Sequence, residues 1–123
     1  AASDVYKRQD TDGAYNTSTY KFTPQVAGTY LFGAGMIVQM SDAKIAQVYI
    51  GKNGTAVANH QAASLQSWGS LDYAGQSVCG PVVMNGSSDW CVAIVYHNQG
   101  SDRTYIASTL EAYQFFWGFR LSV

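Results

Sequence analysis

Two cysteines and two histidines are the residues of this chain best suited to metal binding or nucleophilic chemistry. Cys79 and Cys91 flank a predicted turn. Neither His60 nor His97 stands near them at a spacing that zinc sites use. We therefore predict no metal site and two free, buried thiols. A disulfide is the alternative, but it needs a shifted register, because a symmetric hairpin places Cys91 opposite Val82 rather than Cys79.

The chain contains no recognisable catalytic motif. A serine, His97 and Asp102 would supply a nucleophile, a base and an orienting acid, but nothing in their spacing brings them together. The sequence also lacks a nucleophile elbow, a phosphate-binding loop and paired carboxylates. Its acids are scattered, at Asp42, Asp72, Asp89, Asp102 and Glu111. We predict no catalytic residues and a protein that is not an enzyme.

Two segments combine aromatic and polar side chains in a way that suits ligand binding. One spans residues 66–73 and contains Trp68 and Tyr73; the other spans 98–105 and contains Asp102 and Arg103. An exposed Trp or Tyr beside amide and carboxylate groups stacks on a sugar while the polar groups hold its hydroxyls. These four residues are the predicted ligand-binding set. The alternative for Trp68 is packing in the core or in a subunit interface.

A long strand positions these segments. From Thr29 to Met40 the residues alternate, so that one face carries Tyr30, Phe32, Ala34, Met36, Val38 and Met40. A period of two with one large apolar face predicts a strand that crosses a whole sheet. Pro24 and Gly28 precede it and favour a corner.

Shorter strands and tight turns fill the rest of the chain. A hairpin is predicted around residues 16–18, and a second around Asn53-Gly54, where Lys44–Ile50 turns back. Residues 74–76 read as a turn. The strands 77–84 and 89–98 are predicted to form a hairpin closed by residues 85–88. About ten short strands without helical periodicity predict an all-β antiparallel sandwich.

Composition limits the classes of partner. The 123 residues suffice for one domain with its own core. A net charge of −1 provides no basic footprint for nucleic acid. The longest strongly apolar run, residues 91–96, is far too short to cross a bilayer. Because only 12% of residues are charged while 14% are aromatic, a monomer should expose apolar patches that identical copies can bury.

The spacing of several aromatic residues and glycines resembles a known family signature. The residues that carry it are Asp10, Tyr15, Phe22, Gly28, Tyr30 and Phe32, followed by KNG at 52–54, NGSSDWCVAIVY at 85–96 and the ending FFWGFRLSV from Phe115. This order resembles the C-one-q globular head, a relative of the tumour-necrosis-factor fold. The resemblance covers residues 10–123.

The resemblance implies a ten-stranded antiparallel jelly roll that forms a homotrimer. In such a trimer the apolar residues of the long strands would be divided between core and interface, at Tyr30, Phe32, Tyr96, Phe116 and Phe119. Asp89 would bond local backbone amides at its turn. We expect no cofactor. Calcium, which some relatives bind near the trimer apex, is the alternative.

The chain departs from the family pattern at two positions. Ala34 stands where an aromatic residue usually follows, and Asp4 stands where the first strand has Phe. Residues 4–9, DVYKRQ, resemble the translation of a transposase end sequence used in preparing sequencing libraries. We therefore expect residues 1–9 to be a non-native or disordered leader and 10–123 to be the domain, with its first strand missing or replaced and Phe119 beside an unpaired edge. The alternative is a genuine polar segment.

These expectations combine into a functional hypothesis. We predict a non-enzymatic trimerising recognition head, such as the receptor-binding or trimer-nucleating tip of a phage tail fibre or of a microbial surface filament. It would act outside the cell or on the virion surface, with itself and a cell-surface glycan or protein receptor as partners. The alternative is a monomeric carbohydrate-binding module of a larger secreted protein. The ligand and the source are not encoded in any motif.

Overall fold

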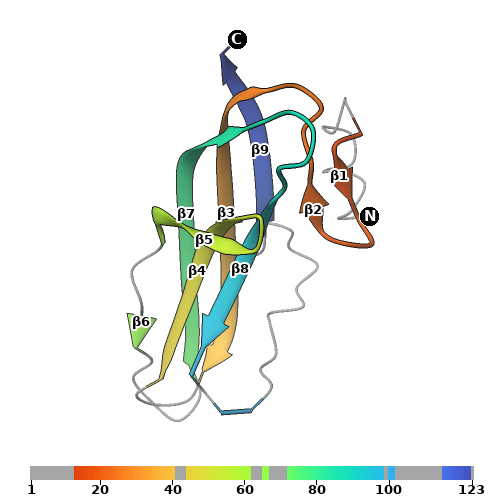
Figure 1. Ribbon diagram of the computed structural model, residues 1–123. Helices are drawn as coiled ribbons and strands as arrows, with labels where there is room; N and C mark the ends of the chain where they lie inside the picture. Colours follow the sequence, from red (N-terminus) through yellow and green to blue (C-terminus); the bar gives the residue numbers. More distant parts are fainter. Residues whose placement is uncertain are drawn as a thin grey trace.

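The computed structural model describes residues 13–40, 44–61, 65–66, 72–98, 100–101 and 115–122, and all regular elements within them are strands (Figure 1). The strands are β1 (Tyr15–Asn16), β2 (Lys21–Phe22), β3 (Gly28–Met40), β4 (Ile45–Lys52), β5 (Thr55–Gln61), β6 (Leu65–Gln66), β7 (Asp72–Met84), β8 (Cys91–His97) and β9 (Phe115–Ser122).

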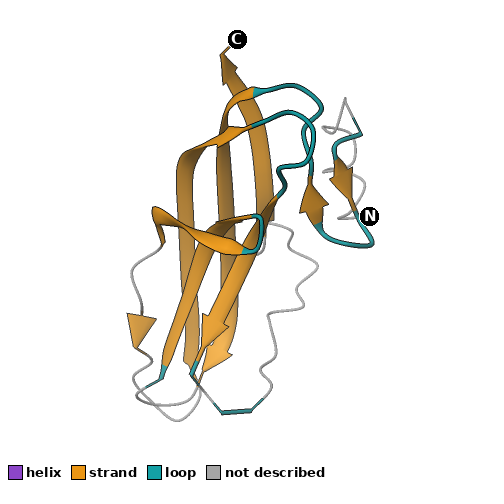
Figure 2. Ribbon diagram, viewed as in Figure 1, coloured by secondary structure: helices purple, strands orange, loops and turns teal. Residues whose placement is uncertain are grey.

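These strands form two antiparallel sheets. The larger sheet has the order β1-β2-β8-β4-β5, with β6 also pairing with β4, and the smaller sheet has the order β7-β3-β9. The two sheets pack face to face, and turns and loops join the strands at the ends of the layers (Figure 2). The predicted all-β antiparallel sandwich is confirmed at this level.

The strand β3 is the central strand of the smaller sheet. It pairs along its whole length with β7, from Gly28↔Met84 to Met40↔Asp72. On its other side it pairs with β9 between Thr29 and Gly35. The predicted strand from Thr29 to Met40 is therefore confirmed.

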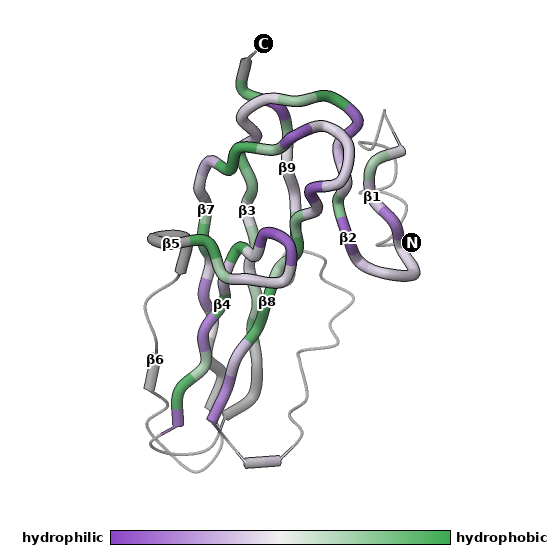
Figure 3. The backbone as a smooth tube through the Cα atoms, in the orientation of Figure 1, coloured by the Kyte–Doolittle hydropathy of each residue, from purple (hydrophilic) through white to green (hydrophobic). Residues whose placement is uncertain are grey.

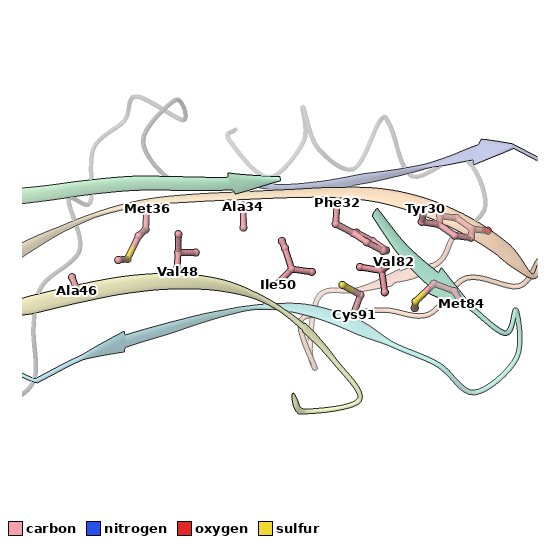
Figure 4. Packing of buried hydrophobic residues seen from close by; sticks show 10 residues of the cluster. All are labelled: Tyr30, Phe32, Ala34, Met36, Ala46, Val48, Ile50, Val82, Met84 and Cys91. Carbon is pink, nitrogen blue, oxygen red and sulfur yellow. The ribbon is translucent and has the colours of Figure 1, made fainter. Parts of the chain in front are cut away.

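The core lies between the two sheets (Figure 4). Inward residues of β3 meet those of β4. The predicted face of β3 is confirmed by burial of Tyr30, Phe32, Ala34 and Met36, while the side chains of Val38 and Met40 lie outside the description. On β4 the buried residues are Ala46, Val48 and Ile50. Phe32 is fully buried, and its ring centroid lies 5.4 Å from that of Phe22 and 5.8 Å from that of Phe116. Close aromatic pairs of this kind add to the area that they bury.

The two hairpins predicted from polar turn residues are present. Tyr15 pairs with Phe22, and the Asn16 side chain accepts hydrogen bonds from two turn amides. Between β4 and β5, Asn53 and Gly54 have φ angles of 52° and 86°. Two consecutive left-handed residues form the primed turn that suits strand twist, and Asn-Gly tolerates this conformation best.

The predicted hairpin between residues 77–84 and 89–98 is wrong. Both segments are strands, but β7 pairs with β3 in the smaller sheet, whereas β8 pairs with β4 and β2 in the larger one. The connection over residues 85–90 therefore crosses between layers. Alternation and turn residues are the same for a hairpin and for such a crossing, so the sequence pattern did not separate them.

Two smaller expectations also fail. Residues 74–76 do not turn, because β7 begins at Asp72 and continues through Gly75, which pairs with Ile37. The two thiols are free, as predicted, but only Cys91 is buried and Cys79 is exposed. Cys79 pairs with Gly33 in the sheet and belongs to the face of β7 that points away from the core.

Candidate functional site

The surface best suited to an interaction is the side of the smaller sheet that faces away from the core. We call it the outer face. Because strand residues alternate, the neighbours of the buried residues Tyr30, Phe32, Ala34 and Met36 point to this side. It comprises Leu31, Gly33, Gly35 and Ile37 of β3, Ser77, Cys79, Pro81 and Val83 of β7, and Phe115, Trp117, Phe119 and Leu121 of β9.

Aromatic side chains of β9 lie across glycines of β3 on this face. Gly33 pairs with Trp117 and Gly35 pairs with Phe115. A Cβ atom added to either glycine would overlap the ring of its partner. The rings therefore use the space that the missing side chains leave, and they lie close to the sheet.

The outer face is apolar and open to solvent. Val83 is 67% exposed, Phe119 53% and Leu121 47%. The rings of Trp117 and Phe119 are nearly parallel, at 17° and with centroids 5.9 Å apart. None of the twelve residues of the outer face carries a formal charge. Contiguous apolar surface of this kind marks an interaction site more often than a free surface.

A polar cluster at one end of the sandwich ties its turns together. Asp89, which is 9% exposed, accepts a hydrogen bond from Asn53 Nδ2 at 2.8 Å and one from the backbone N–H of Asn85 at 2.9 Å. Its carboxylate also pairs with Lys52 Nζ at 2.9 Å. Asn53 completes the cluster by accepting from the Trp90 amide. The predicted bond from Asp89 to a local backbone amide is confirmed.

The bonds of this cluster hold the turns in place and make its carboxylate poorly suited to catalysis. The ammonium of Lys52, followed by the amide of Asn53, holds the pKa of Asp89 below its usual value. A carboxylate that is ionised and fully bonded is a poor general base. Figure 3 shows the hydrophilic β4–β5 turn, where Lys52 and Asn53 lie, against the more apolar strands.

The two thiols have opposite environments. Burial raises the pKa of Cys91 to about 12, so this thiol stays protonated at neutral pH and is a weak nucleophile. Cys79 stands exposed on the outer face. The thiols occupy different sheets, which explains why they form no disulfide.

The predicted ligand-binding residues are not brought together by the described part of the chain. Trp68, Asp102 and Arg103 lie outside the described residues. The backbone of Tyr73 belongs to β7, where it pairs with Gln39, but its side chain lies outside the description. The sugar-binding hypothesis for this set therefore stays a prediction.

The five residues expected in the core or interface take different positions. Tyr30 and Phe32 are in the core, and Phe116 is half-buried and packs against it. Phe119 belongs to the outer face. Tyr96 is 50% exposed on the larger sheet, on the side that faces away from the core.

The sequence analysis did not predict the outer face as one surface, although the spacing of its glycines and aromatic residues is visible in the sequence. Glycines stand at Gly33 and Gly35 on the face opposite Phe32, and the ending FFWGF places large residues at the same period. Pairing glycine with a cross-strand aromatic ring is a way to keep a sheet regular. The signal becomes specific only once β9 is known to pair with β3.

Comparisons with models of known protein families and with curated proteins find no match. No group of three or more potential metal ligands occurs among the described residues. The same part of the chain has no helix long and apolar enough to span a membrane.

Proposed function

We propose that this domain is a non-enzymatic recognition head that assembles as a homotrimer with a C-one-q-like jelly roll. The observation that carries the proposal is the uncharged, exposed outer face of the sheet β7-β3-β9. Burying this face between identical copies removes Val83, Phe119 and Leu121 from water. Closed rings of identical contacts are the usual form of such assemblies.

The sequence supports the family assignment and the role. The spacing of Tyr15, Phe22, Gly28, Tyr30 and Phe32 resembles the C-one-q signature, and heads of that family act by binding rather than by catalysis. A phage tail fibre or a microbial surface filament is the parent structure that we propose. Its partners would be its own copies and a glycan or protein receptor on a cell surface, outside the cell or on the virion.

The experiment is solution mass by light scattering over a dilution series. We expect three chains per particle, and we expect Val83→Lys to give single chains because it places a charge on the outer face. Tyr20→Lys is the matched control, since Tyr20 is 69% exposed but belongs to the β1–β2 turn. A wild-type monomer, or a trimer that survives Val83→Lys, would reject the proposal.

A monomeric carbohydrate-binding module is the second candidate, favoured by the nearly parallel rings of the half-buried Trp117 and the exposed Phe119. Rows of aromatic rings stack on the apolar faces of sugar units. This candidate requires a wild-type monomer whose binding to a glycan array falls when Trp117 is replaced by alanine. A trimer whose glycan binding is unaffected by Trp117→Ala would exclude it.

A further inference from the structure

The sequence contains two Asn-Gly pairs, and both stand in turns of the sandwich. Asn53-Gly54 closes the β4–β5 hairpin, and Asn85-Gly86 begins the connection from β7 to β8. In both pairs the glycine has a positive φ angle, 86° at Gly54 and 74° at Gly86. Asparagine is a thermolabile residue. It loses its side-chain amide most readily before glycine, because glycine has no side chain to hinder the approach of its backbone nitrogen.

This loss, deamidation, is a reaction of the chain with itself and then with water. The backbone nitrogen of the glycine attacks Cγ of the asparagine, so that an N–Cγ bond forms in a cyclic imide and the Cγ–Nδ2 bond breaks. The leaving NH₂ group takes the proton of the glycine amide and departs as ammonia. Water then opens the imide to aspartate or isoaspartate. The attack requires both the asparagine side chain and the glycine backbone to move.

The side chain of Asn85 is held by more hydrogen bonds than that of Asn53. Its Oδ1 accepts from the backbone N–H groups of residues 87–89, each at 3.0 Å, and its Nδ2 donates to a hydroxyl of the same turn at 2.8 Å. Asn53 has one bond at each end, from its Nδ2 to Asp89 at 2.8 Å and from the Trp90 N–H to its Oδ1 at 3.0 Å. Attack on Cγ of Asn53 therefore breaks fewer bonds.

The backbones of the two glycines differ in the same direction. A Cβ atom added to Gly86 would overlap the backbone of residues 26–27, so Gly86 packs directly against another part of the chain. Gly54 is exposed, and the nearest atom to such a Cβ belongs to the Trp90 ring, at an ordinary contact distance of 3.5 Å. The nitrogen of Gly54 therefore has room to approach the preceding side chain, whereas that of Gly86 does not.

We propose that Asn53 is a site of spontaneous deamidation in the folded protein and that Asn85, in the same sequence pair, is protected. The aspartate product has no side-chain N–H to donate to Asp89, and it adds a negative charge beside that carboxylate. Because like charges at hydrogen-bond distance repel, the modification weakens the polar cluster. This inference is independent of the proposed trimer, since the β4–β5 turn is not part of the outer face.

The test follows both sites by peptide mapping and mass spectrometry during incubation at mildly alkaline pH. Deamidation replaces NH₂ by OH, and the mass gain assigns each event to one peptide. In native wild-type protein we expect Asn53 to react roughly tenfold faster than Asn85 or more, since one strong additional hydrogen bond is worth about this factor. In urea the two sites should react at similar rates, because each precedes glycine.

The ratio of the two native rates decides the proposal. A native ratio equal to that in urea would show that both sites react only through the unfolded chain, and it would overturn the proposal. Faster loss at Asn85, or no loss at Asn53 in the native protein, would overturn it as well.

The consequence of the modification is tested with Asn53→Asp, which reproduces the aspartate product. It should raise the equilibrium constant of unfolding by roughly tenfold or more, as the loss of a hydrogen bond to a charged group predicts. Asn85→Asp is the matched control, with an expected change within about threefold, because a carboxylate oxygen accepts the same backbone N–H groups. Equal stability of Asn53→Asp and wild type would refute the weakening of the cluster.

Discussion

The packing of Trp117 over Gly33 leads to a quantitative prediction for Gly33→Ala. The added Cβ overlaps the indole, so the ring must leave its place on the sheet. A buried aromatic side chain covers roughly 150–250 Å². Trp117 is half-buried, so its displacement exposes about half of that area, or roughly 2.5 kcal/mol at about 25 cal/mol/Å². The gain of about 0.5 kcal/mol from removing a strand glycine leaves a net loss of about 2 kcal/mol.

Urea unfolding at one fixed protein concentration measures this loss. Gly75→Ala is the matched control. Gly75 is also a glycine in a strand of the same sheet, but its nearest obstacle is the flexible Ile37 side chain at 3.2 Å, so we expect a change below about 0.5 kcal/mol. In a Trp117→Val background the cost of Gly33→Ala should vanish, as a double-mutant cycle would reveal. A loss of about 2 kcal/mol from Gly33→Ala in the Trp117→Val background, or a gain in stability from Gly33→Ala alone, would refute the packing of Trp117 over Gly33.

Three further predictions concern the ends of the sandwich and its thiols. Gly86→Ala should lower the free energy of unfolding by about 2 kcal/mol or more, as measured by thermal unfolding. Gly86 has φ 74°, and an added Cβ would overlap the backbone of residues 26–27. An unchanged stability would contradict this loop contact. The pKa of Asp89 is lowered by folding, so its contribution is present above about pH 4 and lost as the pH falls through the folded-state value. The denaturant midpoint of the wild type should therefore fall as the solution is made acidic, and that of Asp89→Asn should fall less. Equal falls of the two midpoints would contradict the stabilising role of Asp89 in the polar cluster. Maleimide should label Cys79 faster in the native Val83→Lys monomer than in the wild-type trimer. It should label Cys91 only after the protein unfolds. Labelling of Cys91 in the native protein would argue against its burial.

Local features of the fold were predictable because they depend on neighbours in sequence. The alternation from Thr29 to Met40 specifies a strand and the face that becomes buried. The Asn53-Gly54 turn needs two left-handed residues, and few dipeptides other than Asn-Gly supply them. The burial of Ala46, Val48 and Ile50 follows from a period of two.

The family resemblance also came from sequence alone, because it rests on spacing rather than on contacts. The trimer, the ligand-binding set around Trp68 and the recognition role derive from it or from composition. They remain proposals.

Partners across the sandwich were decided only by the tertiary structure. The same pattern of two strands around residues 85–88 fits a hairpin and a crossing between layers, and long-range pairing with β3 and β4 selected the crossing. The outer face exists because β9 joins β3 from far along the chain. A residue's own sequence determines its preference for a strand and a face, but its partner is determined by the free energy of packing both layers together.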